Sequence, residues 1–174
     1  MEEFDLIFRY NVQSPLDQLI AECGLNYGNI LLNHVGLYLG NNRVIESNKN
    51  GVVITTTNDF CQGKIYVKRL IFSLSKLQKE LLNKKALSYL DVKYNFSYED
   101  SQDDLYCSEL IIAIFNALAD INPFKRHCIT FNNALSNELD ERWLLYYKEA
   151  SSIPNNVMGS HPTSLFVNKS LQLI

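Results

Sequence analysis

The sequence has neither a block of basic residues nor an acidic tail that could recruit an oppositely charged polymer. Its 19 acidic and 16 basic residues leave a formal net charge of -3 at pH 7. We therefore expect no nucleic acid among its partners.

Export and membrane signals are also missing. Residues 1–5, MEEFD, lack the positive region and the uninterrupted apolar region of a secretory signal. No window reaches the ~18 apolar residues of a membrane span, so no integral membrane segment is expected. The sequence as written indicates a cytoplasmic protein, although a periplasmic or secreted chain without its signal peptide would look the same. The oligomeric state stays open.

The cysteines are scattered and are not arranged for metal binding. No C-x-x-C pair occurs, and the adjacent His127 and Cys128 would point apart on an extended chain. We predict no metal site and no cofactor. In a reducing compartment the cysteines would remain thiols, whereas an exported chain could form disulfides. The four cysteines are Cys23, Cys61, Cys107 and Cys128.

What remains is the composition of one globular domain. The chain has 174 residues, of which 47% are hydrophobic and 20% charged, enough to bury a sizeable core. It contains no internal repeat, low-complexity tract or linker. We predict a single domain, residues 1–174.

Short strand-like segments dominate the first half of the chain. They occupy residues 5–10, 34–39, 43–47, 52–57 and 64–70, and Gly- and Asn-containing turns separate the last four. Gaps this short allow hairpins and exclude the crossovers that parallel strands need, which predicts an antiparallel sheet.

Helical spacing appears around and after these strands. Pro15 follows a Ser14 cap and opens a short helix up to Gly24. Residues 75–90 and residues 105 to about 119 show the three- and four-residue apolar spacing of two further helices. Residues 140–150 fit either a helix or a strand, and residues 164–174 a last strand. The fold class is α+β, with a central antiparallel sheet packed against helices.

Cys107 lies where a nucleophilic cysteine is expected. It begins the helix predicted from residue 105, and either Asp103 or Asp104 could cap that helix. A thiol in a first helical turn faces unpaired N–H groups and the positive end of the helix dipole, which favour the thiolate. The alternative is a cysteine that only packs in the core, as most buried cysteines do.

A histidine and a glutamate on neighbouring strands could complete the chemistry. His34 opens one strand, and Glu46 follows twelve positions later, so a hairpin between them would bring both roughly opposite each other. A carboxylate there could fix the tautomer of the imidazole, as the third member of a catalytic triad does. Taken alone, His34 fits a structural residue and Glu46 a solvated edge residue.

The sequence resembles the YiiX/YebB-like branch of the NlpC-type cysteine hydrolases. The resemblance lies in HVGLYLG, RVIES, GVVITTTNDF, KIYVKRL and finally YN...LYCSEL, and it covers roughly residues 4–119. It implies a circularly permuted papain-like fold, related to the lecithin retinol acyltransferases, with Cys107, His34 and Glu46 as the catalytic site.

The resemblance implies less about the substrate. It favours a cysteine peptidase or amidase that cleaves an amide of a peptide or peptidoglycan fragment through an acyl-enzyme. A lipid acyl hydrolase or acyltransferase, or a noncatalytic binding module, are the alternatives; an open polar groove would favour peptides and a deep apolar tunnel acyl chains. Tyr106, beside Cys107, and Asp5, in the first strand, are candidate substrate-binding residues.

Overall fold

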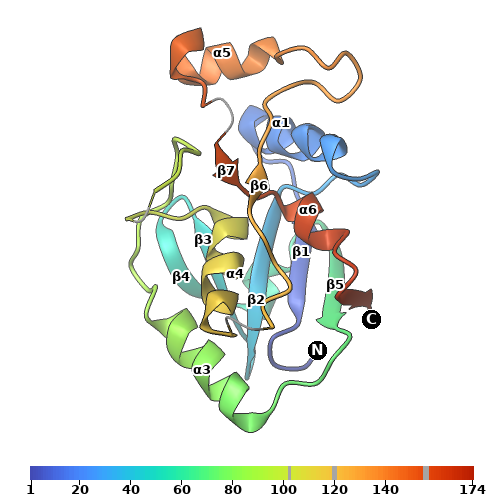
Figure 1. The fold of residues 1–174 in the computed structure, drawn as a ribbon, viewed down its shortest axis with the longest axis vertical. Helices are drawn as coiled ribbons and strands as arrows, with labels where there is room; N and C mark the ends of the chain where they lie inside the picture. The colour runs from blue at the N-terminus through green and yellow to red at the C-terminus, as the bar shows by residue number, and fades with distance from the viewer. Residues whose placement is uncertain (102, 119–120, 155–156) are drawn as a thin grey trace.

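The computed structural model describes residues 1–101, 103–118, 121–154 and 157–174 (Figure 1). Within them, a six-stranded sheet has the strand order β4-β3-β2-β1-β5-β8, and every neighbouring pair is antiparallel. The antiparallel sheet predicted from the short turns is confirmed. The strands are β1 (Leu6–Tyr10), β2 (His34–Gly40), β3 (Arg43–Asn48), β4 (Gly51–Thr56), β5 (Lys64–Leu70) and β8 (Leu171–Leu173); β6 (His127–Cys128) pairs with β7 (Met158–Gly159) separately.

The helices are short and begin at recognisable caps. The Ser14 side chain accepts the Asp17 N–H, and Ser75 and Gln78 form a capping box. The α-helices are α1 (Pro15–Cys23), α2 (Thr57–Phe60), α3 (Lys76–Leu87), α4 (Cys107–Phe115), α5 (Glu141–Tyr147) and α6 (Pro162–Phe166). The described residues also contain the 3₁₀ turns η1 (Gly24–Asn26), η2 (Asn116–Leu118) and η3 (Ala150–Ser152).

The main core lies between α4 and one face of the sheet. In Figure 1, α4 lies across β2 and β3, and it contacts both strands. Val35, Leu37 and Ile45 on that face are fully buried with Leu110 and Ile111 of the helix. Burying large aliphatic side chains contributes roughly 1.5–3 kcal/mol each, so this layer fixes α4 against β2. Together with the six-stranded sheet, it confirms the predicted α+β class.

A second, aromatic cluster lies at the end of the sheet where α1 and α5 are drawn in Figure 1. Its buried members come from distant parts of the chain and include Tyr98, Tyr106, Phe131 and Trp143.

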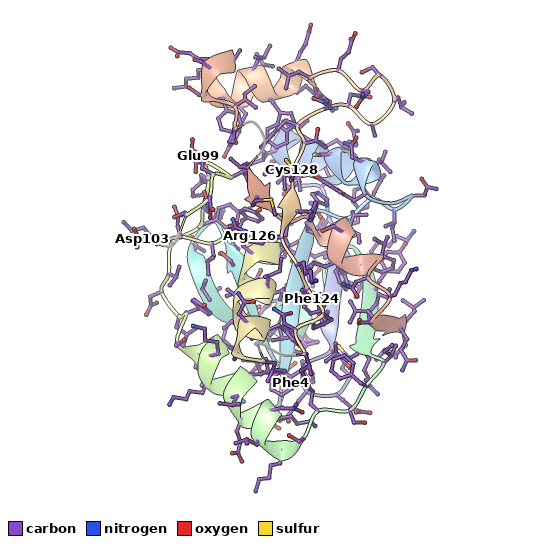
Figure 2. The ribbon with its side chains drawn as sticks, viewed as in Figure 1. Phe4, Glu99, Asp103, Phe124, Arg126 and Cys128 are labelled. Atoms are coloured by element: carbon purple, nitrogen blue, oxygen red, sulfur yellow. The ribbon has the colours of Figure 1, made fainter. Side chains whose placement is uncertain are left out.

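Side chains fill the space around α4, where Figure 2 labels Arg126 beside the helix. Arg126 forms an ion pair with the buried Glu109, with a nitrogen to oxygen distance of 2.9 Å.

Several element boundaries differ from the sequence predictions. The helix predicted over residues 75–90 ends at Leu87, and Thr57, predicted as strand, begins α2. The helix predicted from residue 105 begins at Cys107, and its expected end near residue 119 lies outside the described residues. Residues 140–150 contain a helix, because the Asp140 side chain caps α5 by accepting the Arg142 N–H.

The prediction of one last strand over residues 164–174 was wrong for its first part. His161 caps α6 and Pro162 occupies its first turn, so the chain is helical to Phe166 before β8 begins at Leu171. No helix among the described residues has the length and apolar character needed to cross a lipid bilayer.

Candidate active site

Cys107 is the first residue of α4, with its side chain almost completely buried. The preceding loop is held on both sides: the Leu105 N–H donates to the Lys93 carbonyl at 3.0 Å, and the Ser47 hydroxyl donates to the Leu105 carbonyl at 2.5 Å. The predicted aspartate cap was wrong. Tyr106 is the N-cap, and its backbone N–H donates to the buried Glu109 carboxylate at 3.5 Å.

His34 and Glu46 form a buried pair. The His34 Nε2 atom lies 2.6 Å from Glu46 Oε2, and Glu46 Oε1 accepts the Thr55 hydroxyl at 2.9 Å. Leu37 pairs with Ile45 in the sheet register, so Glu46 faces Gly36 and is diagonal to His34 rather than directly opposite. Diagonal side chains are still within reach across a hairpin. The hydrogen bond expected from the spacing is therefore present.

A glycine makes room for an aromatic ring beside this pair. A Cβ atom on Gly36 would come within 2.6 Å of the Phe60 ring and 2.7 Å of Val44. The ring centroids of Phe60 and His34 are 5.4 Å apart. Because Phe60 is fully buried, the ring shields the imidazole from water on this side.

The charges around His34 favour its protonated form. Burial alone lowers the pKa of His34, but the charge of Cys107 and hydrogen bonds to Cys107 and Glu46 outweigh it and raise the pKa to about 9. Burial likewise raises the pKa of Glu46, but His34, Thr55 and Arg9 hold it below its ordinary value. Since Nε2 is bonded to Glu46, Nδ1 is the ring nitrogen left for the thiol.

Two other thiols, Cys23 and Cys61, are in unfavourable places for catalysis. Burial and the charge of Asp140 raise the pKa of Cys23 to about 12, and its sulfur donates to the Thr130 carbonyl at 2.9 Å. Burial also raises the pKa of Cys61, against the opposing charge of Arg9.

His161 is buried close to the site but is locked in one neutral tautomer. Its Nε2 donates to the Ile20 carbonyl at 2.9 Å, and its Nδ1 accepts the Thr163 N–H at 3.0 Å. Burial lowers the pKa of His161 to about 4. Because both ring nitrogens are occupied by the backbone, His161 has no free position for proton transfer.

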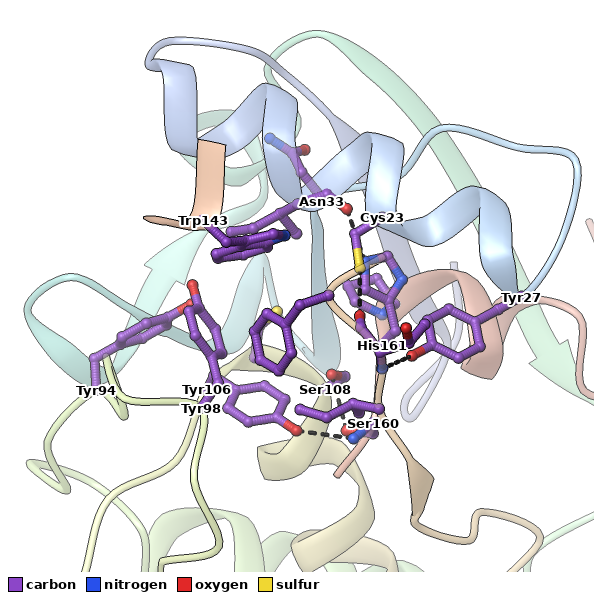
Figure 3. A pocket seen from close by; sticks show the side chains of 16 residues that line it. Cys23, Tyr27, Asn33, Tyr94, Tyr98, Tyr106, Ser108, Trp143, Ser160 and His161 are labelled. Carbon is purple, nitrogen blue, oxygen red and sulfur yellow. Dashed lines mark hydrogen bonds between the residues drawn. The ribbon is translucent and has the colours of Figure 1, made fainter. Parts of the chain in front are cut away.

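Two hollows meet at the cysteine and histidine. The first, here called the aromatic pocket, includes Cys107 and has about 40 Å³ of room for water (Figure 3). The second, the polar groove, includes His34 and Glu46 and has about 510 Å³. Ile20, Asn33 and Tyr94 line both.

The two predicted substrate-binding residues have different positions. Tyr106 lines the aromatic pocket, and its hydroxyl accepts the Ser160 N–H at 2.8 Å. Asp5 is fully buried in an ion pair, with one carboxylate oxygen 2.7 Å from Arg69 Nε, and lines a separate hollow with Glu2. The structure therefore brings Tyr106 to Cys107 and leaves Asp5 outside this group.

Sequence reasoning missed most of the aromatic pocket. Figure 3 shows the rings of Tyr94, Tyr98, Tyr106 and Trp143 around one side of it. The three tyrosines lie in the segment that leads into α4, but the opposite lining comes from the second half of the chain. No local pattern in residues 129–162 indicates that these segments return to Cys107. The residues missed there are Ile129, Thr130, Phe131, Trp143, Ser160, His161 and Pro162.

The chain matches a known protein family along nearly its whole length. The family model described as "Permuted papain-like amidase enzyme, YaeF/YiiX, C92 family" matches residues 2–174. A similar solved structure is the "Crystal structure of metalloprotein yiiX from Escherichia coli O157:H7, DUF1105", which has 22% sequence identity and a TM-score of 0.82. The alignment covers 99% of this chain and 96% of that one. No curated protein matches the chain.

The Escherichia coli protein is described as a metalloprotein. In this chain, residues 1–101, 103–118, 121–154 and 157–174 contain no group of three or more His, Cys, Asp or Glu side chains that could hold a metal ion. The donor set of these residues therefore does not fit a metal centre held by three or more such side chains.

Proposed function

The chain belongs to the permuted papain-like amidase family YaeF/YiiX, and on this basis we propose that it is a cysteine amidase that cleaves amide bonds of peptide-type substrates through Cys107, His34 and Glu46. One observation carries the proposal. A buried His34–Glu46 hydrogen bond lies beside a cysteine at the N-terminus of a helix that the core fixes in place.

Each residue has a distinct part in the proposed reaction. His34 takes the thiol proton, the Cys107 thiolate attacks the amide carbonyl, and a thioester forms as the C–N bond breaks. Protonated His34 gives its proton to the leaving amine. Water, activated by His34, then hydrolyses the thioester and regenerates the thiol. Glu46 keeps the proton on Nε2, so that Nδ1 is free to accept.

The start of α4 supplies the stabilisation of the oxyanion. The backbone N–H of Cys107, in the first turn of the helix, has no intrahelical acceptor and can donate to the developing negative charge. The expected contribution of one such donor is about 2.7–4 kcal/mol. Tyr106 supports this arrangement, because Glu109 and Ser160 hold its backbone and its hydroxyl.

The polar groove supports a peptide or peptidoglycan-type amide as the substrate. Its lining offers amide, hydroxyl and charged groups beside His34, including Gln13, Ser14, Asn48 and Lys49. Such groups can hydrogen-bond a polar chain, whereas an aliphatic chain would leave them unpaired. The match over residues 2–174 also supports treating the whole chain as one catalytic domain.

The test is detection of the covalent intermediate. The protein is mixed with a panel of short peptide amides and peptidoglycan fragments and quenched in acid, and its intact mass is measured. We expect a mass increase equal to the acyl group in the wild type and none in Cys107→Ala. Cys61→Ala is the matched control and should keep the adduct. Turnover that persists in Cys107→Ala would refute the proposed nucleophile.

A further inference from the structure

The two hollows at the site differ in chemistry, and each has a different member of the catalytic pair in its lining. Cys107 lines the aromatic pocket, and His34 and Glu46 line the polar groove. An amide bound across the pair must therefore place one of its two halves in each hollow.

The direction of the substrate follows from the proton transfer. The acyl carbon becomes bonded to the Cys107 sulfur, so the acyl substituent extends from the sulfur. The leaving nitrogen must accept its proton from His34, within hydrogen-bond reach of the imidazole. Because His34 lines only the polar groove of the two, the leaving amine belongs in that groove. The aromatic pocket is then left for the acyl substituent.

The aromatic pocket is small as well as apolar. Its room for water is about 40 Å³, whereas a dry cavity of about 150 Å³ is what accommodates a benzene molecule. Phe131, Trp143 and Ile129 are part of the lining. An acyl substituent that fills it without rearrangement is smaller than a phenyl ring.

The walls of the pocket are held in place rather than loosely packed. Tyr98 has a φ of 55°, in the left-handed region that bulky residues rarely adopt. The buried Asn95 side chain fixes this turn by accepting the backbone N–H groups of Ser97 and Tyr98 and by donating to the Glu99 carbonyl. Strain of this kind persists where surrounding contacts enforce it, often at ligand sites.

The polar groove is larger and presents groups of both charges. Arg9 and Lys49 are cationic, Asp17 is anionic, and Gln13 and Asn50 offer amides. It can therefore take an amine that carries further polar groups, such as an amino acid.

We propose that the preferred substrates are amides that combine a small aliphatic acyl substituent, held in the aromatic pocket, with a polar leaving amine, held in the polar groove. The inference rests on the proposed amidase function and specifies its substrate class. The amide C–N bond breaks, a C–S bond to Cys107 forms, and the thiol proton leaves on the amine through His34. Water then returns the thiol and yields the small carboxylic acid.

The test uses N-acyl glycines, in which only the acyl group varies. Acetyl, propanoyl, phenylacetyl and octanoyl derivatives are compared by release of glycine, detected with an amine-reactive fluorophore. The wild type should favour acetyl and propanoyl over phenylacetyl and octanoyl by at least about tenfold in kcat/KM, the order of magnitude that apolar pocket contacts give. Replacement of glycine by benzylamine should lower kcat/KM.

Enlarging the pocket provides the decisive comparison. Phe131→Ala should shift the ratio of phenylacetyl to propanoyl turnover toward phenylacetyl by at least about tenfold. Ile129→Ala, at the less buried position, should shift it in the same direction and serves if Phe131→Ala does not fold. Leu145→Ala, on the exposed side of α5, is the control and should leave the ratio unchanged.

The possible results distinguish a failure of the proposed substrate class from a failure of the proposed amidase function. Turnover that depends on Cys107 but favours octanoyl, or a ratio that neither pocket variant moves, overturns the inference and leaves the amidase intact. Absence of both turnover and a thioester adduct across the acyl glycines and the peptide panel overturns both.

Discussion

Replacing Glu46 by Gln tests the proposed triad most directly, because the substitution keeps the shape of the side chain and removes its charge. The wild-type carboxylate lies 2.6 Å from His34 Nε2 and accepts a hydrogen bond from its N–H group. The amide N–H of the introduced glutamine can instead donate to Nε2, which would leave the ring proton on Nδ1. That tautomer cannot accept the thiol proton, so we expect kcat/KM to fall on the order of 10²–10⁴-fold.

The electrostatic effect of Glu46 can also be measured through the pKa of the His34 imidazole. A His34 pKa of about 9, against an ordinary 6.5, corresponds to about 3 kcal/mol in favour of the imidazolium. Cys107 and Glu46 provide this stabilisation of the imidazolium, and burial of the ring opposes it. Removing one adjacent opposite charge lowers a histidine pKa by about one to three pH units, so the pKa of His34 in Glu46→Gln should fall well below 9.

The same pKa shifts predict how stability depends on pH. The raised pKa of His34 stabilises the fold fully below about 6.5, and this contribution is lost as the pH rises through about 9. The lowered pKa of Glu46 stabilises the fold above about 4.5, and this contribution is lost at lower pH. The stability difference between wild type and Glu46→Gln should therefore be largest between about pH 4.5 and 6.5 and shrink toward pH 9.

The assays are an NMR titration of the His34 ring, urea denaturation across this pH range, and the pH profile of kcat/KM. Glu80→Gln, on the exposed surface of α3, is the matched control and should change none of them. A Glu46→Gln variant with wild-type turnover and an unchanged His34 titration would refute the assignment of Glu46.

Thiol reactivity, packing beside His34 and the Asp5 ion pair give three further predictions. Substoichiometric iodoacetamide at neutral pH should label Cys107 ahead of Cys23 and Cys61, whose thiol pKa values burial raises, and His34→Ala should slow the labelling of Cys107. Peptide mass spectrometry locates the label, and equal labelling of Cys61 would contradict an activated Cys107. Gly36→Ala places a Cβ 2.6 Å from the Phe60 ring and should lower the free energy of unfolding, measured in urea, by about 1–3 kcal/mol. An unchanged midpoint of urea denaturation would show that the Phe60 ring can move aside to make room for the methyl group. Arg69→Leu leaves the buried Asp5 carboxylate without its guanidinium and should lower Tm while the folded variant keeps its kcat/KM; a selective loss of activity would return Asp5 to the site.

The fold was predictable where local chemistry decides the structure. The strands of the first half alternate with Gly and Asn turns, and Ser14 and Ser75 mark helix starts, so these elements were found within a few residues. The helix α6 was missed, and its residues 164–166 were predicted as part of a last strand over residues 164–174. The side-chain cap that makes it helical uses the imidazole of His161, an uncommon N-cap.

The three proposed catalytic residues were predictable from the sequence, whereas most of the aromatic pocket was not. His34 and Glu46 lie twelve residues apart on a single hairpin, so spacing alone brings them together, and the helix start marks Cys107. The aromatic pocket depends on contacts between segments far apart in the chain, such as Tyr106 with Ser160 and Cys23 with Thr130. Such contacts depend on how the whole chain packs, and no periodicity in one sequence records them.

The last strand of the chain has a consequence for aggregation. β8 lies at the outer edge of the sheet and covers part of β5: Leu173 pairs with Lys68, and the Ile174 N–H donates to the Val67 carbonyl at 3.1 Å. A strand edge with unpaired N–H and C=O groups is a template for another strand, including one from a second copy of the same chain. Clipping or displacing residues 171–174 would uncover that template beside Ile65 and Val67, so a bulky fusion at this end would promote self-association while leaving Cys107 and His34 untouched.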